Sequence, residues 1–298
     1  MGRWSWWQRA AWVLAAALLA STIASCREWS DTRTGRGSTP NSSPATPAEH
    51  GGQRLVVFAA SSLFEPFQEL GKSFQSAHGG TTVEFNFAGS AQLVAQLQQG
   101  ASADVIAFAD LPNMKKAQDA GLVAGEPVIF AKNRLTVVVP RQNTARIQHL
   151  ADLARPGVKV VLAHENVPVG RYAREMLERA SQRPGYGADF AQRVLANVVS
   201  QEINVKQVLA KVALGEADAG IVYVTDVKAA GADVQEIEIP DDVNVVACYP
   251  IAVTKSSRVP ALAQEFVALV QSEEGQAVLE QYGFQTVQPE QAGMEDCS

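Results

Sequence analysis

The chain has 298 residues, of which 47% are hydrophobic, so it is long enough to bury a sizeable core in about two domains. Charged residues make up 19% of the chain, and its formal net charge is -6 at pH 7. This balance excludes a strongly basic nucleic-acid-binding protein, and we expect no nucleic-acid partner.

The N-terminal segment, residues 1–25, has the pattern of an export signal peptide. Arg3 and Arg9 supply positive charge, and an apolar run and small residues follow. The apolar run is shorter than the roughly 20 residues that cross a bilayer, so an uncleaved anchor helix is the less favoured alternative. The sequence Ile-Ala-Ser-Cys at 23–26 resembles a bacterial lipobox, which implies cleavage before Cys26 and attachment of a lipid to that cysteine.

The segment 26–53 continues from the lipobox cysteine and is rich in Ser, Thr, Pro and Gly. It has no apolar period from which a core could form, so we expect a flexible tether. A coil of this length spans on average about 30 Å, which lets a folded body stand off a membrane surface. We therefore expect an exported protein, in the periplasm or on the outer face of the cytoplasmic membrane, anchored by the lipid on Cys26.

From residue 54 on, short apolar runs alternate with helical patterns. Runs rich in β-branched and aromatic residues predict strands at 55–58, 83–87, 105–108, 135–139, 158–162 and 221–224. Apolar residues at helical spacing predict helices that contain 63–74 and 93–97, and further helices at 170–180 and 205–214. Repeated alternation of this kind favours an α/β fold with largely parallel sheets.

Several of these helices begin where a strand ends, and such helix starts are candidate anion-binding sites. The first backbone N–H groups of a helix have no partner within it, and the helix dipole is positive there. Ser62 lies in a Ser-x-x-Glu pattern typical of a capping box, and Ser90 follows Gly89 at the start of the next helix. Taken alone, each serine is more simply explained as the N-cap of its helix. Gly89 also permits close approach of the backbone to something small.

Three further positions occupy comparable places. Val169 and Val205 open helices where only a backbone N–H is available, and Val205 is more simply a core residue of its helix. Tyr223 ends a strand, where its hydroxyl can donate into a cleft outside the strand ends, although an ordinary half-buried tyrosine is the simpler interpretation. The positions together, and none of them alone, indicate a site for an anion.

These positions lie in stretches that resemble the periplasmic molybdate-binding proteins of ABC transporters, part of the type II periplasmic-binding-protein superfamily. The resemblance covers about 55–284, in stretches that occur in the family's order: 57–63 (VFAASSL), 87–90 (FAGS), 100–105 (GASADV), 133–140 (NRLTVVVP), 167–173 (VPVGRYA), 220–223 (GIVY) and 282–284 (YGF). The chain departs from the family in having Ser90 alone where a run of serines is common. It also has Ala163-His164 where Asp-Pro is common.

The resemblance implies a two-lobed type II periplasmic-binding-protein fold. Each lobe would be a mostly parallel sheet flanked by helices, with the ligand in the cleft between the lobes. One lobe would comprise 54–132 plus 251–290 and the other 133–250, joined by two crossover strands, and 291–298 would form a polar tail.

The resemblance also implies the site and the function. Ser62 and Ser90 would each donate a hydroxyl and a backbone N–H, Val169 and Val205 a backbone N–H, and Tyr223 its hydroxyl. The ligand would be molybdate or tungstate, which the sequence does not separate, and the partner would be the membrane permease of an ABC transporter. No cofactor and no directly coordinated metal ion are implied, and the protein would be a monomer.

Other readings of the sequence stay open. A binding protein for sulfate or thiosulfate would share this architecture, and an anion-sensing domain is a further, less favoured alternative. For an enzyme, the chain lacks the G-x-S-x-G, H-E-x-x-H, P-loop and G-x-G-x-x-G motifs, so we expect no catalysis. Cys248 and Cys297 either pair, as exported proteins allow, or stay free thiols.

Overall fold

The computed structural model describes residues 52–287 and 297, and every element below lies within them. The predicted signal peptide, Cys26 with the tether as far as residue 51, and all of the tail 291–298 except Cys297 lie outside the described residues. Within the described part, no helix is both long and apolar enough to span a membrane.

The strands form two groups, which we call the first and second lobes, around one shared strand. In the first lobe, β1 (Arg54–Ala60) pairs in parallel with β2 (Thr82–Ala88) and β3 (Val105–Ala107). The next strand in this lobe, β9 (Val246–Thr254), runs antiparallel to β3. The first lobe is therefore built from both ends of the described chain.

In the second lobe, β5 (Val160–Ala163) pairs in parallel with β6 (Val198–Glu202) and β7 (Ala219–Tyr223). A short strand, β8 (Val234–Ile237), runs antiparallel to the shared strand. The strand order across both lobes is β2-β1-β3-β9-β4-β7-β5-β6. The parallel pairing expected from the β–α alternation is thus found away from the shared strand, and antiparallel pairing beside it.

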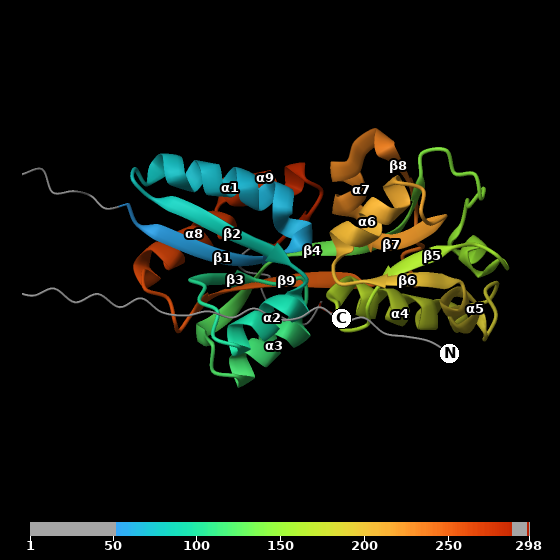
Figure 1. Cartoon of the computed structure of the whole chain (residues 1–298), viewed down its shortest axis with the longest axis horizontal. Helices are drawn as coiled ribbons and strands as arrows, with labels where there is room; N and C mark the ends of the chain where they lie inside the picture. The colour runs from blue at the N-terminus through green and yellow to red at the C-terminus, as the bar shows by residue number, and fades with distance from the viewer. Residues whose placement is uncertain (1–51, 288–296, 298) are drawn as a thin grey trace, which may run out of the picture. The chain divides into compact units, whose positions relative to one another are not determined.

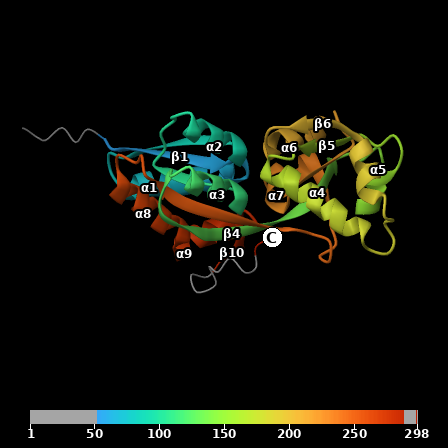
Figure 2. The same cartoon turned by 90° about the horizontal axis from the view of Figure 1, so that it is seen from below.

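The shared strand is β4 (Val123–Pro140), which passes from one lobe to the other (Figures 1 and 2). It pairs with β9 as far as Arg134 and then with β7 and β8, and in its middle, at Ala131 and Lys132, also with the short β10 (Gln285–Thr286). The sequence predicted only 135–139, because Gly125 and Pro127 are typical strand breakers. The structure accommodates them in a register shift between Ala124 and Val128.

Helices cover both faces of each sheet (Figure 1). Those of the first lobe are α1 (Phe64–Ala77), α8 (Pro260–Gln271) and α9 (Glu273–Gln281) on one face and α2 (Ser90–Gln98) and α3 (Leu111–Asp119) on the other. Those of the second lobe are α6 (Val205–Ala213) and α7 (Val224–Ala230) on one face and α4 (Pro168–Ser181) and α5 (Phe190–Ala196) on the other. The α/β expectation is confirmed.

The core of the first lobe is closed by an aromatic cluster. The ring of Phe266, on α8, lies with its centroid 6.0 Å from that of Phe67 and 5.3 Å from that of Phe74, both on α1. All three side chains are buried. Burial of such a side chain stabilises a fold by about 1.5–3 kcal/mol, so a helix near the C-terminus completes a core begun near the N-terminus.

Several predicted boundaries differ from the structure by one or more residues. The strand predicted at 221–224, for example, ends at Tyr223, and Val224 is the first residue of α7. The Asp226 carboxylate accepts a hydrogen bond from the Tyr223 backbone N–H at 3.1 Å, which turns the chain into the helix. An apolar run cannot reveal this, because Val224 is as favourable in a strand as Val222.

Cys248 and Cys297 form a disulfide bond, with their Cα atoms 5.7 Å apart, which decides between the alternatives left by the sequence. Cys248 lies on β9 and is fully buried in a small apolar cluster with Ile129 and Val287. The bond therefore fixes Cys297 to a strand that lies next to the shared strand.

We expect Cys297→Ser to lower the free energy of unfolding. For cysteines 49 residues apart, the chain-entropy model gives an upper value of about 4 kcal/mol. Equilibrium unfolding in urea of the oxidised chain and the variant measures the difference, and the reduced wild-type chain should match the variant. Equal midpoints for the oxidised chain and the variant would show that the bond adds no stability.

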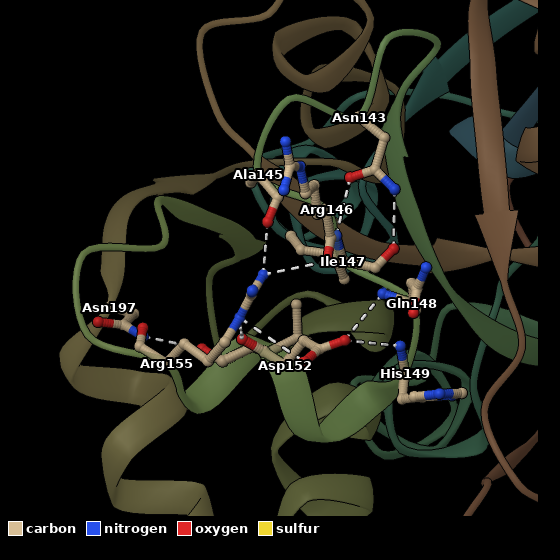
Figure 3. Close-up of polar contacts among 10 residues, drawn as sticks. Asn143, Ala145, Arg146, Ile147, Gln148, His149, Asp152, Arg155 and Asn197 are labelled. Carbon is tan, nitrogen blue, oxygen red and sulfur yellow. Dashed lines mark hydrogen bonds and ion pairs between the residues drawn. The ribbon is translucent and has the colours of Figure 1, made fainter.

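The loop between β4 and β5 is held by local polar contacts (Figure 3). The Asp152 carboxylate accepts hydrogen bonds from the backbone N–H groups of Gln148 at 2.8 Å and His149 at 3.0 Å. Arg155 donates to the Ala145 carbonyl oxygen at 2.6 Å. Burial alone would raise the pKa of Asp152, but the two N–H donors, together with Arg155 and His149, outweigh it and lower the pKa.

Because its folded-state pKa is lowered, ionised Asp152 stabilises the fold above the unfolded-state pKa of about 3.9, and this stabilisation is lost as the pH falls through the folded-state pKa. We expect Asp152→Asn to lower the melting temperature at about pH 7. The two melting temperatures should converge as the pH falls through the folded-state pKa of Asp152. Thermal unfolding over this pH range is the measurement, and a constant gap would contradict the assignment.

Candidate functional site

The residues predicted to bind an anion all line one small cavity between the lobes. The lining residues are Ala60, Ser61, Ser62, Ala88, Gly89, Ser90, Ala109, Val167, Pro168, Val169, Val205 and Tyr223. The cavity is narrow, since the volume open to the centre of a water molecule is about 10 Å³. Residues up to Ala109 belong to the first lobe and those from Val167 onwards to the second. The structure thus brings together positions that lie far apart in the sequence.

Helix starts converge on this cavity. Ser61 begins a short 3-10 helix (Ser61–Leu63), Ser90 begins α2, Pro168 begins α4 and Val205 begins α6. Backbone N–H groups at such starts have no partner within the helix, and the positive ends of the helix dipoles point outward there. Val169 and Val205, at 1% and 3% exposure, have buried side chains, so each contributes an apolar wall and a backbone donor. Such a set of donors stabilises an anion.

Ser62 does not cap its helix, so the capping interpretation is wrong. The α1 helix begins only at Phe64, with Leu63 as its N-cap residue. The Ser62 hydroxyl instead lies 2.9 Å from the hydroxyl of Tyr249 on β9. Pro66 lies in the first turn of α1, where its missing N–H is tolerated and the helix start is displaced.

Buried groups behind Ser62 hold its hydroxyl in place. The Asn133 side-chain oxygen accepts from the Arg134 backbone N–H at 2.9 Å, which makes its amide nitrogen the donor to the Tyr249 hydroxyl at 3.5 Å. Burial raises the pKa of Tyr249. Either hydroxyl of the Ser62–Tyr249 pair can donate to the other, so Ser62 offers the cavity its hydrogen when it accepts from Tyr249 and a lone pair when it donates.

Ser90 is likewise not an N-cap. Gly89 occupies the N-cap position, and Ser90 is the first residue of α2. The Ser90 hydroxyl oxygen accepts a hydrogen bond from the Ala109 backbone N–H at 3.1 Å. This contact uses a lone pair of the hydroxyl and leaves its hydrogen for a ligand.

Tyr223 is fully buried, at 1% exposure, and not half-buried as the simpler interpretation held. Its hydroxyl lines the cavity and has no hydrogen-bond partner among the described residues. Burial, with smaller contributions from Tyr249 and Tyr172, raises the pKa of Tyr223 well above its ordinary value, so it is a neutral donor. An unsatisfied buried hydroxyl costs about 1–3 kcal/mol, a cost that an acceptor in the cavity would remove.

Two glycines let the walls of the cavity approach. A Cβ at Gly89 would lie 2.4 Å from the carbonyl oxygen of Ile203, which belongs to the other lobe. A Cβ at Gly170 would lie 2.2 Å from the carbonyl oxygen of His164. Gly89 was expected to admit a small ligand, and the structure shows that it also admits the backbone of the second lobe.

The loop before α4 contains Ala163-His164, where the related family commonly has Asp-Pro. Here the His164 carbonyl oxygen accepts a hydrogen bond from the Val167 backbone N–H at 2.9 Å, and this contact leads the loop into α4.

The lining contains no Arg, Lys, Asp or Glu, and its polar side chains are all hydroxyls. Among the described residues there is also no group of three or more His, Cys, Asp and Glu side chains arranged to hold a metal ion. The donors are thus neutral groups held by backbone and by buried tyrosines. A site of this kind favours an anion through fixed dipoles and hydrogen bonds.

Residues 55–285 match the protein family described as bacterial extracellular solute-binding protein. The chain belongs to this family. The molybdate-binding protein ModA of Mycobacterium tuberculosis is 39% identical to it over 271 residues, which cover 91% of this chain and 95% of that protein. This solute-binding protein is therefore not an enzyme, and its resemblance to the periplasmic molybdate-binding proteins is confirmed.

Solved structures show the same two-lobed fold. The periplasmic molybdate-binding protein of Azotobacter vinelandii superposes with a TM-score of 0.68 at 20% identity, over 78% of this chain and 100% of that one. The sulfate-binding protein SubI of Mycobacterium tuberculosis superposes with a TM-score of 0.72 at 21% identity, over 80% of this chain and 89% of that one. The fold is thus shared by binding proteins for more than one oxyanion.

Sequence reasoning missed the groups that support the site. Asn133 and Tyr249 orient Ser62 from strands that cross between the lobes, and no pattern in the sequence pairs them with a serine near residue 60. Tyr172 on α4 is also fully buried, and its hydroxyl has no partner among the described residues, although it does not line the cavity. The one feature of the sequence that could have indicated these supporting groups is a polar residue, Asn133, at the start of an apolar strand.

We expect Tyr223→Phe to leave the melting temperature of the ligand-free protein unchanged or to raise it slightly. The substitution removes a buried hydroxyl without a partner and retains the packed ring. Thermal unfolding without added anion measures this. As a comparison, Tyr249→Phe removes a hydroxyl bonded to Ser62 and should lower the melting temperature. A large loss of stability in the Tyr223 variant would show that its hydroxyl has a partner in solution.

Proposed function

We propose that this solute-binding protein captures molybdate or tungstate outside the cytoplasm and delivers it to the membrane permease of an ABC transporter. The observation that supports it most is the convergence of helix starts and three hydroxyls, on Ser62, Ser90 and Tyr223, around one cavity without side-chain charges. The similarity to molybdate-binding ModA over nearly the whole chain supports the same ligand.

The positions of the lining residues support each proposed contact. Ser62 and Ser90 donate their hydroxyls and backbone N–H groups, Val169 and Val205 donate backbone N–H groups, and Tyr223 donates its hydroxyl. Removing water from a dianion is costly, and hydrogen bonds to charged groups contribute roughly 1.5–3 kcal/mol each. About half a dozen such bonds, less the cost of ordering, reach the roughly -8 to -12 kcal/mol of micromolar to nanomolar binding.

Selectivity follows from the same donors. A protonated phosphate brings a hydrogen atom that a site made only of donors cannot accept. Donors at fixed distances also suit one oxyanion size, so a smaller tetrahedral anion such as sulfate leaves some of them too far away. Neutral donors further allow release to a transporter, because no ion pair has to be broken.

A sulfate-binding protein is the second candidate, and the shared fold of the sulfate-binding protein SubI favours it specifically. Sulfate is a dianion that is not protonated at neutral pH, so the charge and the all-donor lining suit it equally. The size of the cavity in the ligand-bound protein is what separates the two candidates.

The remaining assignments belong to this proposal. Cleavage before Cys26 and lipidation of that cysteine would hold the protein at the outer face of the membrane, with 26–53 as the tether. The units that close on the anion are 54–132 plus 251–290 and 133–250, and the protein acts as a monomer.

The test is calorimetric titration of the chain from residue 49 on, the unit that contains every described element, with molybdate, tungstate, sulfate and phosphate. We expect molybdate and tungstate to bind with micromolar or lower dissociation constants and the other two anions to bind at least a hundredfold more weakly. Ser62→Ala and Ser90→Ala should each weaken molybdate binding roughly 10- to 100-fold, because each removes a hydrogen bond to a charged group. Ser76→Ala, an exposed serine on α1, is the matched control.

The outcomes are distinct. Tight binding of sulfate alone would retain the site and replace the ligand. If no oxyanion binds, or if the two serine variants bind molybdate as well as the wild-type protein, the cavity is not the site and the proposed function is wrong.

A further inference from the structure

Two ion pairs join the lobes on either side of the cavity. Arg171 on α4 donates through Nη2 to Oδ2 of Asp110, just before α3, at 2.9 Å. The ammonium group of Lys206 on α6 lies 2.9 Å and 2.8 Å from the two carboxylate oxygens of Glu65 on α1. In each pair the cation belongs to the second lobe and the anion to the first, and none of the four residues lines the cavity.

The first pair depends on the lobes being together. Asp110 is only 1% exposed, so its charge needs partners. Asn113 supplies its backbone N–H and side-chain amide from the same lobe, and Arg171 supplies the cation from the other. Asp110 directly follows Ala109, and Arg171 lies just beyond Val169, and both of these neighbours line the cavity. The contact therefore forms only where the cavity walls meet, and it neutralises a carboxylate that would otherwise repel a bound dianion.

The second pair involves a cation with a partner in each lobe. Besides Glu65, Lys206 lies 3.4 Å from Oδ1 of Asp226, which belongs to its own lobe and is fully buried. Burial raises the pKa of Asp226, and the charge of Lys206 opposes this rise. When Glu65 moves away, Lys206 still compensates Asp226. Separation of the lobes at this point therefore costs only the contact with Glu65.

We propose that the Asp110–Arg171 and Glu65–Lys206 pairs are latches, which hold the lobes together and set how long a bound oxyanion stays, without contacting it. This inference rests on the proposed function, because the latched form is the form that encloses the ligand. If only the closed form binds tightly, the apparent dissociation constant equals the intrinsic one divided by the closed fraction. A weakened latch then lowers affinity mainly through faster dissociation.

Glu65→Gln is the most direct test, because it removes one charge and leaves Lys206 paired with Asp226. In the full-length chain we expect the dissociation constant and the dissociation rate of molybdate to rise roughly two- to fivefold, the range for a partly exposed ion pair. Raising the salt concentration should bring the variant and the wild-type protein together, since salt screens exposed pairs. A purely structural defect would show no such convergence.

A double-mutant cycle isolates the pair. Lys206→Met weakens binding, and adding Glu65→Gln to it should weaken binding no further, because the contact is already lost. The matched control is Glu202→Gln, which breaks the 2.6 Å ion pair with Lys211 inside the second lobe. This control should lower the melting temperature and leave the dissociation rate of molybdate unchanged.

Hydrogen–deuterium exchange of the ligand-free chain separates failure of the latches from failure of the proposed function. We expect Glu65→Gln to speed exchange of the backbone amides of Gly89, Ser90, Val167 and Val169, since these residues line the cavity that opening exposes. Unchanged exchange, or an unchanged molybdate dissociation rate in a protein that binds molybdate, would overturn the latch. If the wild-type protein binds no oxyanion but exchange still increases, the latch stands and the proposed ligand is wrong.

Discussion

The pairing of β4 with β9 is the constraint on which the rest of the structure depends. The two strands lie side by side from Val123 to Arg134, and β4 then continues as the strand beside β7. The two lobes are therefore joined through β4, which stops pairing with β9 at Arg134 and pairs with β7 from Leu135 on. The cavity residues lie on both sides of this connection, so the course of β4 sets how close the two sets of donors lie.

The site is supported by buried groups. The amide of Asn133 donates to Tyr249, whose hydroxyl in turn lies within hydrogen-bonding distance of the Ser62 hydroxyl. At Ser90 the Ala109 backbone N–H occupies one lone pair of the hydroxyl, which leaves the hydroxyl hydrogen for an acceptor. A hydroxyl in water turns freely between donor and acceptor, whereas Ser90 is positioned to donate before any ligand arrives.

The sequence predicted the α/β alternation, because strands and helices follow from apolar periodicity. The positions that line the cavity were chosen from their joint occurrence at helix starts and strand ends and from the family resemblance, and none of them was indicated alone. Only the simpler alternative for the two serines, that each caps its helix, is wrong, because Ser62 bonds to Tyr249, a residue on a strand far away in the chain. Sequence reasoning also missed the ion pairs of Asp110 and Glu65, which depend on how the lobes meet. The first part of β4, residues 123–134, was not predicted as a strand. It contains residues that disfavour a strand locally, and its pairing with β9 accommodates them.

The place of β9 and α8 along the chain governs the order in which the protein can fold. β3 lies between β1 and β9, and Phe266 completes the core around Phe67, so the first lobe lacks a strand and a core side chain until residues 246–266 have been synthesised. Strands β5 to β8 of the second lobe all precede that point. Contacts this distant in sequence form slowly, because a long loop has to close first. The first lobe, although it begins first in the chain, therefore can be completed only after all the strands of the second lobe have been synthesised.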